Sequence, residues 1–254
     1  MLYLGKGPAA HDPFKRTLHA ENYLVEEGLP IIPDIIDWAS AVKEWEMFGN
    51  DTMGCCTVAS GGHLIEAWTA YSREEVNLTD TDILAAYKAV SGYDGTEATD
   101  NGAVMLDVLK HWRTVGIGGR KIGAFMRVNH KDMKEIMTSL YLFGGLYIGV
   151  GLPKSAESQF ADGKPWEVVP WWKSGRKFNS WGGHCISLHK GWVKDGRVWA
   201  ATWARLQEIA EGFFLRYTDE AFAIVSPDWI RDTGLAPSGL NMEQLITDLN
   251  RVTK

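Results

Sequence analysis

A cysteine and a histidine with the character of a nucleophile and a base stand in two glycine-containing motifs of this 254-residue sequence. Cys56 ends the run Asn-Asp-Thr-Met-Gly-Cys-Cys, which begins at Asn50, and His184 follows two glycines and precedes Cys185. A thiol becomes a good nucleophile when an imidazole takes its proton or a helix N-terminus lowers its pKa. The apolar spacing after Cys56 predicts a helix with this cysteine in its first turn, where the helix dipole favours a thiolate. The two motifs therefore predict a Cys-His pair that attacks a carbonyl carbon.

The same residues allow a structural and a metal-binding interpretation. A cysteine at the start of an apolar helix is commonly a small core residue. A zinc site could combine Cys55, Cys56 and His184, but adjacent cysteines lack the spacer of common structural zinc sites, and no fourth ligand stands out. His63 lies two helical turns beyond Cys56, too far along the helix to be its base, and is expected in the core. We therefore expect no metal and no cofactor.

The residues before Cys56 follow a known pattern. Asp37 and Trp38, then Asn50 and Gly54, precede Cys56 at fixed offsets. This arrangement resembles the mature N-terminus of papain-like cysteine peptidases, which have an Asp-Trp pair, an oxyanion-hole glutamine, a glycine and the nucleophilic cysteine at the same offsets. The resemblance implies that Cys56 is the nucleophile. It also implies that Asn50, whose side chain is one methylene shorter than that of glutamine, stabilises the oxyanion.

The residues around His184 resemble the same family. Gly183 and His184, followed by an apolar run, are similar to the strand that carries the family's catalytic histidine. The resemblance implies that His184 is the base and that Trp203 shields its imidazole.

One family residue has no direct counterpart. The family orients its histidine with an asparagine, and the best counterpart here is Ala201, whose side chain cannot hydrogen-bond to an imidazole. Loss of the orienting group leaves the base in the wrong tautomer or ring angle for part of the time. Thr202 and Asp219 are the candidate replacements. The site is therefore expected to be either impaired or completed in another way.

The order of helical and strand patterns predicts an α+β, papain-like fold. Helical spacing dominates residues 30–119, with helices expected at 56–71, from Thr79 onward and at 104–115. Residues 121–225 read mainly as strands, with one helix at about 131–142. The expected strands are 146–150, 185–188, 198–203, 213–217 and 222–225. Helices first and a sheet second imply a helical half packed on an antiparallel β half, with the active-site cleft between them.

Three regions are expected along the chain. Residues 1–29 are polar and form an N-terminal arm, residues 30–225 form the papain-like domain covered by the resemblance, and residues 226–254 form a C-terminal segment. The last part of that segment, Asn241 to Val252, has the spacing of an amphipathic helix.

Composition and charge exclude several classes of protein. The net charge is -6 and the sequence pI is about 5.7, so no basic surface for nucleic acid is expected. No apolar run is long enough to span a membrane, and the N-terminus lacks the apolar core of a signal peptide, so we expect synthesis in the cytoplasm. Three cysteines, two of them adjacent, indicate reduced thiols rather than a disulfide framework.

Two functions are consistent with these patterns. The first is a papain-like thiol hydrolase that acts on a peptide or amide bond of a peptide or protein substrate. The second is a catalytically impaired scaffold, a pseudoenzyme that binds protein partners in a larger assembly. The overall pattern is also similar to uncharacterised proteins of bacteria, especially actinobacteria, and of their bacteriophages. A structural role in a phage particle is therefore one form of the second function.

A tryptophan-rich loop could serve either function. Residues 163–183 are rich in lysine, glycine, proline and serine and come just before His184. The loop contains Trp166, Trp171, Trp172 and Trp181. Exposed aromatic side chains in such a loop could grip a partner or a sugar polymer, or fold as a lid over the cleft.

Overall fold

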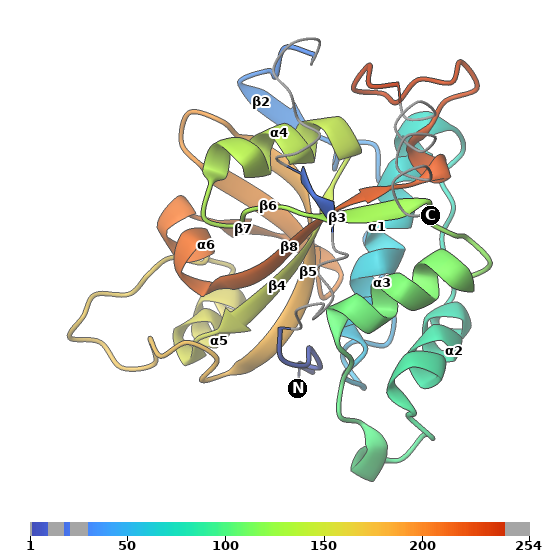
Figure 1. Cartoon of the computed structure of the whole chain (residues 1–254). Coiled ribbons are helices and arrows are strands. Elements are labelled where there is room, and N and C mark those ends of the chain that lie inside the picture. The colour runs from blue at the N-terminus through green and yellow to red at the C-terminus, as the bar shows by residue number, and fades with distance from the viewer. Residues whose placement is uncertain (1, 10–17, 21–29, 242–254) are drawn as a thin grey trace.

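The computed structural model describes residues 2–9, 18–20 and 30–241 and divides into a helical half and a sheet half (Figure 1). The α+β, papain-like arrangement expected from the sequence is confirmed. The expected helix from Asn241 to Val252 lies, apart from its first residue, outside the described residues.

The helical half is built around one buried helix. Its helices are α1 (Cys56–Ser72), α2 (Asp80–Ser91), the short 3-10 helix η2 (Glu97–Thr99) and α3 (Met105–Thr114). Every residue of α1 from Cys56 to Thr69 is buried, as is typical of a helix that is covered on all sides. Thr79 caps α2 in a capping box with Asp82, as the sequence predicts for the start of this helix.

The other half is a curved sheet, to which the described residues contribute eight strands. They are β1 (Leu18–His19), β2 (Ile35–Asp37), β3 (Ala124–Arg127), β4 (Leu146–Leu152), β5 (Gly182–Trp192), β6 (Arg197–Thr202), β7 (Arg205–Ile209) and β8 (Thr218–Val225). The order across the sheet is β1-β3-β8-β4-β5-β6-β7, and β2 pairs with the far part of β5. All pairs are antiparallel except β1 with β3. The sheet therefore includes a short strand from the expected N-terminal arm.

Three helices and one turn of 3-10 helix complete the fold: α4 (Met133–Phe143), α5 (Lys154–Ala161), α6 (Glu211–Tyr217) and η3 (Pro227–Trp229). The prediction of a strand at 213–217 is wrong, because these residues belong to α6. Phe213, Phe214 and Tyr217 are buried. Their spacing fits one face of a helix, and a short apolar run of this kind does not distinguish helix from strand by composition.

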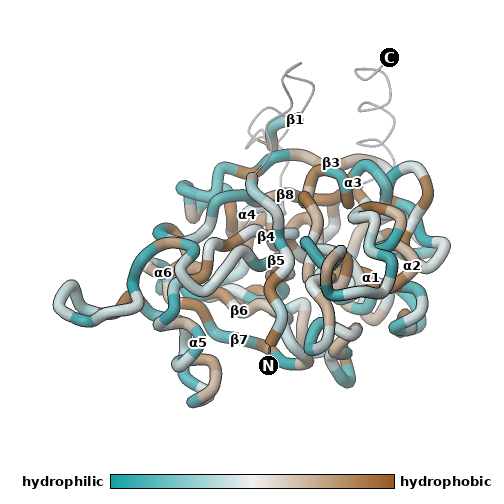
Figure 2. The backbone as a smooth tube through the Cα atoms, turned by 90° about the horizontal axis from the view of Figure 1, so that it is seen from below, coloured by the Kyte–Doolittle hydropathy of each residue, from teal (hydrophilic) through white to brown (hydrophobic). Residues whose placement is uncertain are grey.

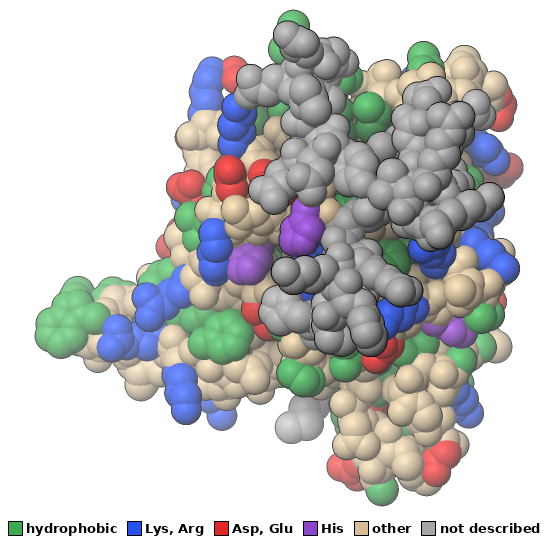
Figure 3. Space-filling model, in the orientation of Figure 1, with side chains coloured by type: hydrophobic (Ala, Val, Ile, Leu, Met, Phe, Trp, Pro, Cys, Tyr) green, Lys and Arg blue, Asp and Glu red, His purple; other side chains and the backbone are tan. Residues whose placement is uncertain are grey.

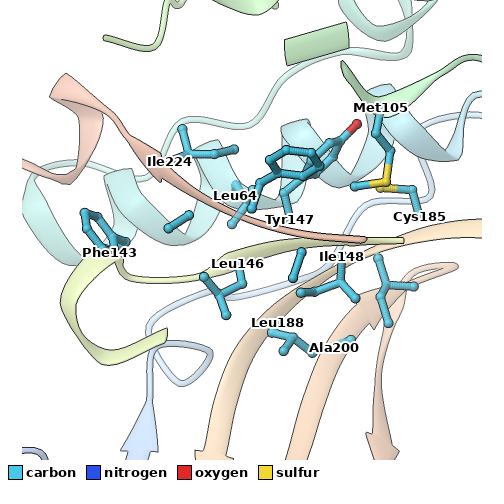
Figure 4. Close-up of a cluster of buried hydrophobic side chains, with 14 of the residues drawn as sticks. Leu64, Met105, Phe143, Leu146, Tyr147, Ile148, Cys185, Leu188, Ala200 and Ile224 are labelled. Atoms are coloured by element: carbon cyan, nitrogen blue, oxygen red, sulfur yellow. The ribbon is translucent and has the colours of Figure 1, made fainter. Parts of the chain in front are cut away.

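The core lies between α1 and the sheet. Because side chains alternate along a strand, Tyr147 points toward α1, where it lies near Leu64 and Met105 (Figure 4). Leu146 and Ile148 point to the opposite face of the sheet. The Tyr147 hydroxyl donates a hydrogen bond of 2.7 Å to the carbonyl of a residue in the first turn of α1. Both faces of the central strands are thus buried, and the N-terminus of α1 is fixed against β4 and β5. Figure 2 shows white and brown segments along the strands in the middle of the molecule.

Candidate active site

Cys56 is the first residue of α1. The carbonyl of Cys55 accepts hydrogen bonds from the N–H groups of Val58 and Ala59 at 2.8 and 3.0 Å, which starts the helix. The Cys56 side chain is fully buried, and its thiol lies against the backbone N–H groups of Cys185, Gly5 and Thr57. The structure thus places Cys56 at the positive end of the helix dipole and next to the strand that carries His184.

His184 is held by the end of β6. A hydrogen bond of 2.7 Å joins its Nε2 to the Thr202 hydroxyl oxygen. Its ring stacks on that of Trp203 with 4.0 Å between centroids and 9° between planes. Its Nδ1 is buried and has no hydrogen-bond partner among the described residues. One ring nitrogen is therefore oriented by Thr202, and the other has no partner among the described residues.

Strand alternation explains why Thr202, rather than Ala201, reaches the imidazole. Ala201 pairs with Ser187 across the sheet, and its side chain packs with Trp45 in a small separate cluster. Successive side chains of a strand point to opposite faces, so Thr202 lies on the other face. The hydroxyl group takes the place that the resemblance assigned to an asparagine.

Cys185 points away from the site. Its thiol is a neighbour of Ser60 and of the Tyr147 hydroxyl in the core, again because adjacent strand residues alternate. No disulfide forms, and Cys55, Cys56 and Cys185 are free and buried. Among the residues that the structure describes, no group of three or more histidine, cysteine or acidic side chains is arranged to hold a metal ion.

Asn50 and Gly54 lie in the turn that leads into α1. Asn50 is buried, and its side-chain oxygen has no hydrogen-bond partner among the described residues. The N–H of Gly54 donates to both carboxylate oxygens of Asp100, at 2.9 and 3.1 Å, and Asp100 also accepts a hydrogen bond from Tyr87. This buried network fixes the backbone just before the cysteine pair.

Burial keeps both proposed catalytic groups neutral. It raises the pKa of the Cys56 thiol to about 11, although backbone N–H groups and the charge of Lys6 act in the opposite direction. Burial also lowers the pKa of His184 to about 3, with a smaller contribution from His63. In this conformation the pair is a thiol and a neutral imidazole rather than a thiolate and an imidazolium.

The N-terminal segment, residues 2–9, causes much of this burial. It lies between the helices and the sheet, where the sequence analysis expected a cleft (Figures 1 and 2). On the helical side, the Gly5 carbonyl accepts from Ala103 N–H at 2.7 Å, and Gly7 N–H donates to the Ala103 carbonyl at 2.9 Å. On the sheet side, Lys6 N–H donates to the Gly183 carbonyl at 3.1 Å. The segment therefore bridges the two halves across the candidate site.

Glycines make this close approach possible. A Cβ atom on Gly5 would lie 1.8 Å from the Gly54 carbonyl oxygen, and one on Gly183 would lie 2.4 Å from the Lys6 carbonyl oxygen. One on Gly102, which has a φ of +71°, would lie 1.8 Å from the Gly5 carbonyl oxygen. Backbone therefore packs on backbone along the whole contact.

The remaining sequence candidates have other positions. Asp219 forms an ion pair with Lys6 at 3.1 Å and does not orient His184. His63 is a buried core residue, as expected, and its Nε2 contacts the Glu46 carbonyl at 2.8 Å. The tryptophans of the loop differ in exposure: Trp166 is completely buried, whereas Trp171 and Trp172 are 74% and 70% exposed.

The two exposed tryptophans belong to a loop between α5 and β5 that projects from the body of the protein (Figure 1). Hydrophobic side chains gather at its tip (Figure 3). The loop therefore does not fold over the site as a lid. No helix of the described residues is long and apolar enough to cross a bilayer.

Sequence reasoning missed the residues that cover Cys56. Gly5 and Lys6 occur in a short Gly-Lys-Gly run that matches no motif, and they act mainly through backbone atoms. The excess of glycine at positions 5, 7, 54, 102 and 183 is the one sequence signal of such a contact, and it does not say which glycines meet.

Comparison with known proteins supports the fold and does not identify the activity. No family profile matches the sequence, and no curated protein matches it significantly. Among solved structures, the chain is similar to xylellain, a cysteine protease from Xylella fastidiosa, with a TM-score of 0.64 and 12% identity over 88% of this chain and 96% of that one.

Two further structures show the same likeness. The digestive procathepsin L2 proteinase of Tenebrio molitor matches with a TM-score of 0.59 and 11% identity, covering 87% of this chain and 78% of that one. A procathepsin B of Trypanosoma congolense matches with a TM-score of 0.56 and 11% identity, covering 87% and 86%. The resemblance found in the sequence is thus confirmed at the level of structure, and the chain has the papain-like fold.

Proposed function

We propose that the protein is a thiol hydrolase that cleaves a peptide or amide bond, with Cys56 as nucleophile and His184 as base. The observation that carries this proposal is the state of the His184 ring. Thr202 holds its Nε2, Trp203 stacks on its face, and its Nδ1 is unpartnered among the described residues beside the strand that contacts Cys56. His63 and His189 also have a partnered Nε2 and an unpartnered Nδ1 among the described residues, so what distinguishes His184 is that the backbone N–H of the next residue in its strand, Cys185, lies against the Cys56 thiol.

The proposed reaction proceeds in two stages. His184 takes the thiol proton at Nδ1, the Cys56 sulfur bonds to the carbonyl carbon, and the carbonyl π electrons move to oxygen. The carbon–nitrogen bond then breaks, and the imidazolium gives its proton to the departing amine. In the second stage His184 deprotonates a water molecule that attacks the thioester, and the carbon–sulfur bond breaks to release a carboxylic acid and the thiol.

In this scheme two groups stabilise the oxyanion of each stage. The backbone N–H of Cys56 belongs to the first turn of α1, where N–H groups have no partner within the helix. Asn50 is buried in the preceding turn. Removal of one such donor typically lowers kcat by about 10²- to 10³-fold. Thr202 does not touch the reacting atoms in this scheme and is a positioning residue.

The N-terminal segment must leave before a substrate can enter. A substrate carbonyl has to approach Cys56 from the space that Gly5 occupies. We therefore expect the closed conformation to be inactive and activity to depend on displacement of residues 2–9.

The test measures alkylation of Cys56 by iodoacetamide between pH 5 and 10, followed by intact mass. It uses full-length protein carrying Gly5→Ala to displace the segment, with Cys55→Ser to leave fewer competing thiols. An activated pair gives a rate plateau below pH 7 that disappears when His184→Ala is added. Rates that follow an ordinary thiol pKa near 8.5 and do not respond to His184→Ala would contradict the proposal.

A second candidate function is a binding scaffold without turnover. Its support is the closed conformation itself, in which the site is filled and the thiol and imidazole are both neutral. The exposed Trp171 and Trp172 would then be contacts for a partner, as in the phage-particle role considered for this sequence. An absence of thiol activation in the alkylation test would favour this function.

A further inference from the structure

Lys6 lies in the closed site in the manner of a bound extended peptide. Its main chain forms a parallel β-bridge with Ala103 on the helical side and a hydrogen bond to Gly183 on the sheet side. These contacts use only backbone atoms, which every peptide has. Any selectivity at this position must therefore come from the surroundings of the side chain.

The Lys6 side chain ends between two carboxylates. Its Nζ lies 3.1 Å from Asp219 Oδ2 and 3.6 Å from Glu220 Oε2, and the lysine side chain is 2% exposed. Nζ also donates to the Gly7 carbonyl at 3.1 Å. A buried ammonium ion is costly unless opposite charge and hydrogen bonds compensate its lost hydration, and here both are present.

Two neighbouring cations, Arg127 and Lys131, also act on the carboxylates. Arg127 lies 3.5 Å from Glu220 and balances one negative charge. Lys131 also acts on Asp219, but its ammonium group is held by the carbonyls of Leu215 and Thr218. His130, a further neighbour of Asp219, has a lowered pKa because of burial and the adjacent cations. Among the described residues, Lys6 is the cation within ion-pair distance of Asp219, so this carboxylate would lose its direct ionic partner if Lys6 left.

The shape of this site fits a long aliphatic stem with a charged end. A Cβ atom on Gly149 would lie 2.3 Å from Lys6 Cε and 2.8 Å from Met105 Sδ. The glycine therefore opens the space through which the methylene groups pass, and Met105 gives that space an apolar wall. Gly149 lies at a β-bulge between β4 and β8, which brings the strand with Asp219 and Glu220 to this point.

We propose that this site, formed by Met105, Gly149, Asp219 and Glu220, is a specificity subsite that accepts a lysine or arginine side chain of the peptide substrate. In the closed protein Lys6 occupies it. The inference rests on the proposed hydrolase function and adds the substrate class: peptides with a basic residue at the position that enters this subsite. Asp219 is the specificity-determining residue, because it makes the shorter contact to the ammonium group.

The test measures peptide binding without turnover. Full-length protein with Gly5→Ala, Lys6→Ala and Cys56→Ser is titrated by calorimetry with the blocked peptide Tyr-Leu-Gly-Lys-Gly, the sequence of residues 3–7. Versions with arginine, norleucine or glutamate in place of lysine are compared. Norleucine keeps the stem and lacks the charge, so it isolates the contribution of the two carboxylates.

The lysine and arginine peptides should bind about 10- to 100-fold more tightly than the norleucine peptide, which is the usual range for a hydrogen bond to a charged group. Added Asp219→Asn should reduce this difference, and the glutamate peptide should bind most weakly. Equal affinity for lysine and norleucine, or no binding of either, overturns the inference. Because Cys56 is replaced by serine, the binding result does not depend on whether the protein is a hydrolase. If the protein is a hydrolase but binds the lysine and norleucine peptides equally well, only the subsite proposal is contradicted.

Discussion

Replacing Gly5 by alanine should open the candidate active site without disturbing the fold. The added Cβ would stand 1.8 Å from the Gly54 carbonyl oxygen, and real Cβ contacts are essentially never shorter than 3.0 Å. The Cβ is bonded directly to the backbone and the oxygen belongs to it, so no flexible side chain can yield. Gly5 does not have a positive φ, and alanine therefore adds a steric clash but no backbone strain.

The size of the effect follows from the contacts that are lost. The segment must move by more than an ångström, which breaks the two hydrogen bonds with Ala103 and the one with Gly183. Each contributes about 0.5–1.5 kcal/mol net, or about 1.5–4.5 kcal/mol together. A difference of about 1.4 kcal/mol is a factor of ten, so the ratio of open to closed protein should rise by about 10- to 1,000-fold.

Alkylation by iodoacetamide measures this ratio, because buried Cys56 reacts only from the open state. Intact mass gives the rate, and Cys56→Ser in the same background assigns it to this thiol. Gly7→Ala is the matched control, since its first contact is a Val104 side-chain methyl at 3.0 Å. The reasoning fails if Gly5→Ala reacts no faster than Gly7→Ala while circular dichroism shows both to be folded.

The remaining predictions concern stability. Thr202→Val should lower the free energy of unfolding by about 1–3 kcal/mol in urea titrations, because it leaves His184 Nε2 buried without its partner, and Thr202→Ser should restore most of it. The free energy of unfolding should be highest near pH 6.5. In the unfolded chain His63 and His184 take up protons below pH 6.5, whereas in the folded protein their pKa values are lowered to about 4 and about 3, so stability falls as the pH drops below 6.5. Unfolded Glu66 ionises near pH 4.5, whereas burial raises its pKa in the folded protein to about 9, so Glu66 lowers the stability as the pH rises from about 5 to about 9, by about 1.4 kcal/mol per pH unit. This loss sets the net slope between about pH 7 and about pH 8, above which thiols such as Cys56, whose pKa burial raises to about 11, add a loss of their own. Glu66→Gln should remove the loss between about pH 7 and about pH 8 in thermal melts, and an unchanged slope there would show that Glu66 is not the group responsible.

The sequence predicted the parts of the fold that depend on local pattern. The helix that begins at Cys56, the helix that starts after Thr79 and the β4 strand were all expected, because helical spacing, threonine and aspartate at a helix start and a run of residues that favour strands are local signals. The particular capping box between Thr79 and Asp82 was not predicted. The α6 helix was missed because its apolar residues suit either periodicity.

The candidate site likewise has residues that the sequence predicted and residues that it did not. Cys56, His184 and Trp203 could be placed by matching motifs. The structure stacks Trp203 on His184 and sets the backbone N–H of Cys185, the residue after His184, against the Cys56 thiol. The N-terminal segment could not be placed from sequence, because its contacts join residues far apart in the chain and use backbone atoms. Only the Lys6 ion pair uses a side chain, and opposite charges so distant in sequence do not predict a contact.

The identity of the group that orients His184 bears directly on the choice between enzyme and scaffold. Ala201 in the expected asparagine position argued for an impaired site, because alanine offers no hydrogen bond. The side chain that faces the imidazole is instead that of the next residue, Thr202, and its hydroxyl forms the required contact at 2.7 Å.

A hydroxyl can both donate and accept, so it fixes the ring angle but selects the tautomer less strictly than a carboxamide oxygen, which only accepts. The tautomer is then selected at the other nitrogen, where a neutral Nδ1 has to face a thiol rather than water. A buried site keeps water away from Nδ1, but the burial that raises the pKa of Cys56 and lowers the pKa of His184 also disfavours proton transfer between them. We therefore expect the transfer to occur only when residues 2–9 are displaced and a substrate occupies the site. An inactive closed state is consistent with such an enzyme, so the presence of the segment is not by itself an argument for a scaffold.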